Sequence, residues 1–98
     1  MSYSTQTTTT KSPTESYEIV LKTLPVQGFK IVRTRDFAGL VQASKVIDGL
    51  SITFNVSCLM GKETKIHVAC LTRGDSASNA EKAAVDGLLD ALTQALAV

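Results

Sequence analysis

The chain has 98 residues and a mass of 10.4 kDa, with 44% hydrophobic and 19% charged residues. This length excludes a two-domain enzyme, and the composition is that of a globular chain rather than a disordered one. Ten Lys and Arg residues against nine Asp and Glu residues give a net charge of +1, which is too small to indicate a dedicated nucleic-acid binder.

The chain opens with a Thr- and Ser-rich leader that has no hydrophobic periodicity. Residues 2–10 read Ser-Tyr-Ser-Thr-Gln-Thr-Thr-Thr-Thr, and such a sequence buries too little surface to offset the entropy of ordering. We therefore expect residues 1–11 to be disordered and residues 12–98 to form a single domain. With no apolar run of roughly 18 residues and no secretion signal, we expect a soluble, cytoplasmic protein.

The first predicted helix covers residues 12–24. Ser12 is suited to cap this helix, Pro13 suits its first position, and Glu15 completes a capping box. The apolar stripe recurs at helical spacing and consists of Tyr17, Val20, Leu21 and Leu24. Pro25 and Gly28 then mark the end of the helix.

Four strands are predicted at residues 29–34, 40–47, 50–60 and 64–72. Asp48-Gly49 favours a two-residue hairpin turn, because both turn positions require a positive φ. From Leu50 to Met60 apolar and polar residues alternate, which indicates one buried and one exposed face. The link at residues 35–39 does not fix the pairing of the first strand.

Ser78 and Glu81 form a second capping box before a C-terminal helix. The order α-β-β-β-β-α predicts an α+β fold in two layers, a four-stranded antiparallel meander with the N- and C-terminal helices packed on one face. No helix lies between the strands, which excludes a βαβ nucleotide-binding fold.

The two cysteines are predicted to be buried and reduced. In-phase pairing of the last two strands places Cys58 opposite Ile66 and Cys70 opposite Phe54, roughly 13 Å apart and too far for a disulfide. The chain has no CxxC motif and one histidine, His67, which lacks partners for base catalysis. We therefore expect no enzyme activity, no metal site and no cofactor.

The exposed sheet face is predicted to be polar and mildly basic. Residues 29–73 hold seven Lys and Arg against three Asp and Glu. Outward parity gathers Gln42, Ser44, Ser51, Thr53, Asn55, Ser57, Lys65, His67 and Arg73 on this face. The candidate binding residues for an anionic partner are Lys30, Arg33, Arg35, Lys45, Lys65, His67 and Arg73. The alternative is a face that is merely solvated. Nucleic acid is not expected, because the face has no aromatic side chains for base stacking.

Two features fit this simple fold poorly. Lys45 has inward parity, so its side chain must extend to an edge or find a polar partner. Val46, Leu59 and Leu71 have outward parity, and exposed apolar residues of this kind suit self-association.

The order of helix, four-strand meander and helix is similar in architecture to the kinase-associated lipid-binding domains. That resemblance implies anionic-lipid binding through basic residues such as Lys30, Arg33 and Arg35. Our first hypothesis is a non-catalytic binding or interaction module that self-associates as a homodimer through the sheet face or a strand edge. One alternative is a module that binds an anionic lipid, phosphate or protein through the basic region. The other is a small-ligand carrier. Its pocket residues would be Phe54, Val56, Val68 and Leu88, with Lys45 as a polar anchor.

Overall fold

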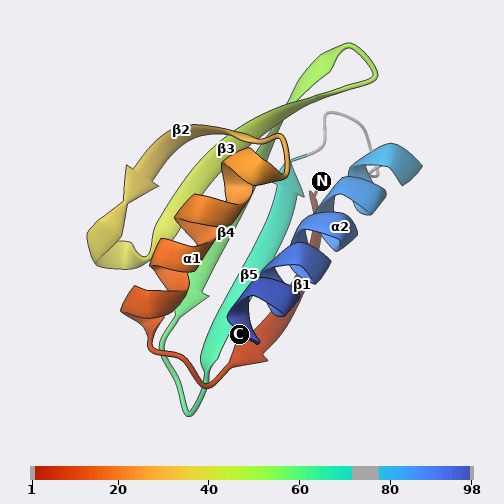
Figure 1. Ribbon diagram of the computed structural model, residues 1–98. Coiled ribbons are helices and arrows are strands. Elements are labelled where there is room, and N and C mark those ends of the chain that lie inside the picture. Colours follow the sequence, from red (N-terminus) through yellow and green to blue (C-terminus); the bar gives the residue numbers. More distant parts are fainter. Residues whose placement is uncertain (1, 72–77, 98) are drawn as a thin grey trace.

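The computed structural model describes residues 2–71 and 78–97, in which an antiparallel sheet forms one layer and two helices the other (Figure 1). The elements in chain order are β1 (Ser2–Thr9), α1 (Pro13–Val26), β2 (Lys30–Arg35), the short 3-10 helix η1 (Asp36–Ala38), β3 (Leu40–Ile47), β4 (Leu50–Leu59), β5 (Thr64–Leu71) and α2 (Asn79–Leu96). The strand order in the sheet is β1-β5-β4-β3-β2. The α+β class and the meander from β2 to β5 are therefore as predicted.

The described sheet has five strands, so the prediction of four strands and a disordered leader was wrong. β1 pairs with β5 along its whole length, from Ser2 opposite Leu71 to Thr9 opposite Thr64. Threonine has a high strand propensity because its branched side chain packs well on a pleated surface. Tyr3 is the one large apolar residue in this segment, so hydrophobic alternation could not reveal the strand.

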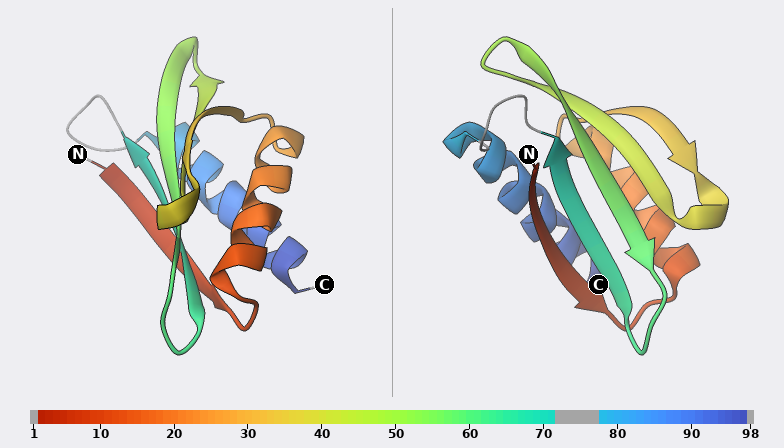
Figure 2. Two further views of the ribbon diagram at one scale, coloured as in Figure 1. Left: turned by 90° about the vertical axis from the view of Figure 1, so that its left-hand side faces the viewer. Right: turned by 180° about the vertical axis from the view of Figure 1, so that it is seen from behind.

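Both helices cover the same face of the sheet, as predicted (Figure 2). Each begins at the predicted capping box: the backbone N–H of Glu15 donates to the Ser12 Oγ over 3.1 Å, and that of Glu81 donates to the Ser78 Oγ over 3.1 Å. α1 continues through Pro25 to Val26, two residues beyond the predicted end at Leu24.

The Asp48-Gly49 turn sets the register of the central hairpin. Both residues have positive φ, 52° and 79°, and Ile47 pairs with Leu50. This register propagates to β5, where Cys58 lies opposite Ile66 and Cys70 opposite Phe54. Both cysteines are free and buried, as predicted.

The core lies between the sheet and the two helices. The Phe29 and Phe54 rings meet edge to face, with centroids 5.0 Å apart. The four side chains assigned to a carrier pocket all belong to this core cluster, three from the sheet and one from α2: Phe54, Val56, Val68 and Leu88. None of the four is more than 1% exposed, so these side chains form part of the core and do not line an open pocket. In the described part of the chain, neither helix has the length and apolar character needed to cross a membrane.

Candidate functional site

The helices leave one face of the sheet uncovered (Figure 2). The residues of β3 and β4 that face outward there are mostly polar. Pairing across the strands places Arg33 opposite Gln42, and Gln42 opposite Asn55. The Gln42 side-chain amide donates to the Asn55 side-chain oxygen over 3.3 Å. We refer to the face that carries these residues as the outer face.

Five of the seven predicted binding residues belong to the outer face, in two groups. Arg33 and Arg35 of β2 line a shallow recess of about 90 Å³ with Leu40, Gln42 and Asn55, and Lys30 lies opposite Ser44. Lys65 and His67 lie on β5. Because β3 and β4 lie between β2 and β5, the two groups are roughly 14 Å apart at about 4.8 Å per strand.

Lys45 does not join these cations. Its Nζ donates to the Gln27 backbone oxygen over 3.3 Å and lies 4.9 Å from the centre of the Phe29 ring. The lysine therefore reaches the edge of the core, as its parity predicted, and satisfies a carbonyl at the C-terminal end of α1, where a positive charge is favourable. Arg73 lies outside the described residues.

The charges on the sheet are of one sign. No Asp or Glu falls within the bounds of the five described strands, whereas those strands contain Lys30, Arg33, Arg35, Lys45 and Lys65. The carboxylates of the described residues lie in the helices and turns. The outer face is therefore a surface on which cations have no neutralising partner within the sheet.

The three apolar residues with outward parity do not form one patch. All three are exposed, but Leu59 and Leu71 lie at opposite ends of the β4–β5 ladder, opposite Lys65 and Thr53. Val46 lies near the hairpin turn, opposite Ser51. The polar side chains between them make this face a poor apolar interface.

The two edges of the sheet differ in character. The β2 edge is six residues long, is interrupted by a bulge between Ile31 and Arg33, and carries three cations. The β1 edge is eight residues long, uncharged and free of proline. Within the described chain β5 is the one strand that pairs with β1. Bulges and charges protect an edge against pairing, so β2 is protected and β1 is not.

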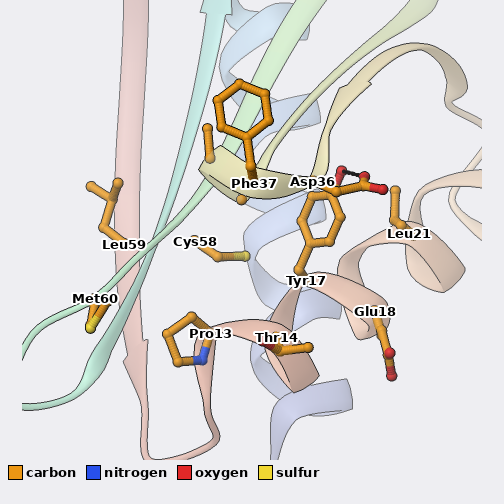
Figure 3. A pocket seen from close by; sticks show the side chains of 12 residues that line it. Pro13, Thr14, Tyr17, Glu18, Leu21, Asp36, Phe37, Cys58, Leu59 and Met60 are labelled. Carbon is orange, nitrogen blue, oxygen red and sulfur yellow. Dashed lines mark hydrogen bonds between the residues drawn. The ribbon is translucent and has the colours of Figure 1, made fainter.

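A cleft of about 770 Å³ lies beside η1, at the N-terminal end of α1 and the end of β4 (Figure 3). Its lining residues are Pro13, Thr14, Tyr17, Glu18, Leu21, Asp36, Phe37, Ala38, Gly39, Cys58, Leu59 and Met60. The Tyr17 hydroxyl donates to the Asp36 carboxylate over 2.7 Å and so connects α1 to η1.

Burial raises the pKa of two groups that line this cleft. It raises the pKa of Tyr17 to about 12, with a further contribution from the hydrogen bond to Asp36. Burial also raises the pKa of the Cys58 thiol to about 11. At neutral pH the phenol and the thiol are therefore protonated, and the charge in the cleft comes from carboxylates.

Sequence reasoning missed this cleft. Residues 35–39 were expected to be a plain connection, whereas Asp36–Ala38 forms η1 and presents Phe37 at 90% exposure. Met60 was expected to face inward, but β4 ends at Leu59 and Met60 is 85% exposed. The sequence did contain a signal for η1. Residues 36–39 read Asp-Phe-Ala-Gly, and a glycine readily adopts the left-handed conformation that ends a short helical turn.

Taken together, the described residues form a small two-layer α+β domain with an open sheet face, an unprotected edge at β1 and a cleft beside η1. No family model matches the chain, and no curated protein matches it. Among the solved structures, 41 chains match. One is the crystal structure of Ara h 8.0201, with a TM-score of 0.63 and 12% sequence identity over 100% of this chain and 99% of that chain. At this identity the likeness shows that the two chains share a fold and nothing beyond it.

Proposed function

We propose that this protein is a non-catalytic interaction module that pairs with a second copy of itself through the free edge of β1. The observation that carries the proposal is the contrast between the edges: β1 offers eight uncharged residues, whereas β2 has a bulge and three cations. A free strand edge presents a row of backbone donors and acceptors that another strand can satisfy.

The composition of β1 supports a second copy as its partner. The strand holds Thr, Ser, Gln and one Tyr, and it carries no charge that would select a charged partner. Two antiparallel copies of β1 would place Thr and Ser residues opposite one another, and such cross-strand pairs each contribute roughly 0.2–1 kcal/mol. The pairing is isologous, because the same edge serves both copies.

The protected β2 edge limits the assembly to two copies. Pairing through β1 would join two five-stranded sheets and would leave a β2 edge at each outer side. Because these edges resist further pairing, the assembly closes as a dimer and does not extend into a fibre.

The test is the solution mass, measured by light scattering over a range of protein and salt concentrations. We expect twice the 10.4 kDa of one chain, with little sensitivity to salt. The variant Ser4→Lys/Gln6→Lys places like charges on exposed positions of β1 and should raise the dissociation constant at least about tenfold, or about 1.4 kcal/mol.

The matched control is Ser51→Lys/Gln94→Lys, which adds the same charge at exposed positions outside β1. It should leave the dimer intact, and circular dichroism should show that both variants are folded. A wild-type chain that stays monomeric at every concentration would refute the proposal. So would a dimer that both variants weaken equally.

A second candidate function is the binding of an extended polyanion to the outer face. The observation that favours it is the absence of Asp and Glu within the bounds of the described strands, combined with the recess that Arg33 and Arg35 line. Unpaired cations on an open surface attract anions and raise their association rate. Arg also binds carboxylate and phosphate groups in a bidentate manner.

Retention on immobilised heparin in a salt gradient tests this second function. We expect Arg33→Gln/Arg35→Gln to elute at clearly lower salt than the control Lys22→Gln/Lys62→Gln, which removes the same charge from exposed positions in α1 and in the β4–β5 turn. Equal shifts would mean that net charge alone governs retention, and the candidate site would be discarded.

A further inference from the structure

The cleft beside η1 has the size of a small-molecule site. Its volume of about 770 Å³ lies within the roughly 300–1,000 Å³ that is usual for such sites. It is built by three elements that other contacts hold in place: Tyr17 joins α1 to η1, and the Cys58 backbone N–H donates to the Gly39 oxygen over 2.8 Å, which joins η1 to β4.

Large apolar side chains surround the cleft without being used in the core. Phe37 is 90% exposed, Met60 is 85% exposed and Leu59 is 47% exposed. Figure 3 shows Phe37 on one side of the Cys58 side chain, with Leu59 and Met60 on another. Apolar surface of this amount is costly to leave in water and is typical of a site that is covered by a ligand.

The ionisable residues of the lining are all acids: Glu18, Asp36, and the neutral Tyr17 and Cys58. No Lys, Arg or His is among the lining residues. One Asp36 oxygen accepts from Tyr17 over 2.7 Å, which orients the carboxylate. An apolar cleft with this charge repels carboxylates and phosphates and favours a cation.

The Cys58 side chain adds a polar group inside the cleft. It is 5% exposed, lies at the centre of the lining residues (Figure 3), and its thiol makes no hydrogen bond within the described part of the chain. A ligand that fills the cleft would contact a weak donor and acceptor there. The rings of Tyr17 and Phe37 also present π faces, which attract a cation at close range.

We propose that this cleft binds a protonated organic amine that carries an apolar body. The ammonium group donates to the Asp36 carboxylate oxygen that does not accept from Tyr17, and the apolar body lies among Phe37, Leu59 and Met60. The cleft shares no lining residue with the β1 edge or with the recess at Arg33 and Arg35, so the inference stands independently of the proposed self-association.

Three probes with the same phenylbutyl body and different charge test the inference: 4-phenylbutylamine, 4-phenylbutanol and 5-phenylpentanoate. Each is titrated into the ¹⁵N-labelled protein up to about 10 mM, which saturates a site of millimolar affinity. We expect the amine to shift the amide signals of η1 and of the end of β4 and to bind more tightly than the alcohol. We expect the carboxylate to bind most weakly. Absence of shifts with the amine, or equal binding of amine and carboxylate, would overturn the proposal.

Two variants locate the binding groups. Asp36→Asn keeps an acceptor for Tyr17 but removes the charge, and it should weaken amine binding about tenfold. Asp90→Asn in α2 is its control and should leave the affinity unchanged. Phe37→Ala removes a side chain that is 90% exposed, so the fold should tolerate it, and it should weaken all three probes. Val26→Ala, also exposed, is the control for that change. If Asp36→Asn and Asp90→Asn act alike, the ammonium site is not at Asp36.

Discussion

The backbone conformation of Gly39 determines how the cleft beside η1 is built. Its φ is 62°, in the left-handed region, and a Cβ built on it would lie 2.8 Å from the Cys58 backbone oxygen. Gly39 ends η1 and begins the ladder with β4, so its conformation determines where Asp36 and Phe37 lie. Any residue with a side chain would be strained there and would also displace β4.

Gly39→Ala should therefore destabilise the protein by about 1–3 kcal/mol, the cost of a strained residue in a packed structure. The control is Gly87→Ala in α2, where an added Cβ meets nothing within 4 Å. That change should stabilise the protein by about 0.5–1 kcal/mol, because alanine is the better helix former. Urea denaturation measures both free energies of unfolding. Effects of the same sign would contradict the assigned role of Gly39.

The sequence was most informative about which individual residues face one another across the sheet. Strict alternation along residues 50–60, together with the Asp48-Gly49 turn, was sufficient to predict the facing pairs of Cys58 and Cys70, because a shift of one residue would turn every buried side chain outward. Met60 escaped this reasoning. The alternation continues to Met60, but β4 ends at Leu59, and periodicity does not show where a strand leaves the sheet.

At the scale of elements, β1 is the principal correction. Its inner side is held by α2: the Tyr3 hydroxyl donates to the Asp86 carboxylate over 2.8 Å, and the Lys82 Nζ lies 5.8 Å from the Tyr3 ring centre. At the other end of the strand, Thr9 is buried and its Oγ1 accepts from the Lys11 backbone N–H over 3.3 Å. These contacts come from residues distant in sequence or from polar groups, and neither leaves a hydrophobic pattern.

Deletion of residues 1–9 distinguishes a strand from a disordered leader. We expect the free energy of unfolding to fall by about 2 kcal/mol, the order of the burial of one large side chain, because the β5 ladder loses its partner and Tyr3 its contacts. Urea denaturation of dilute protein measures the change. In the intact chain, hydrogen exchange should show protected amides in β1. If the stability were unchanged and the β1 amides were unprotected, the segment would be the disordered leader that the sequence predicts, and the assignment of β1 as a strand would be wrong.

At the scale of the whole molecule, the helices and the meander were predictable because caps, turns and hydrophobic periods are local in the sequence. The candidate sites were less so. The outer face followed from parity, which correctly grouped Gln42 with Asn55. The cleft arises where α1, η1 and β4 meet, and the approach of three elements is set by packing rather than by any local pattern. The difference between the two edges could not be predicted either, because such a prediction requires knowing which strands are outermost.

The pairing of β1 with β5 joins segments that are far apart in the chain. During synthesis β1 emerges before β5, and about 55 residues separate the end of β1 at Thr9 from the start of β5 at Thr64. At roughly 5–20 residues per second, the ribosome needs about 3–11 s to make that interval. For this time β1 has neither its strand partner nor α2 to cover it. Its polar, threonine-rich composition keeps this waiting segment hydrated, where a more apolar strand would invite aggregation on the nascent chain.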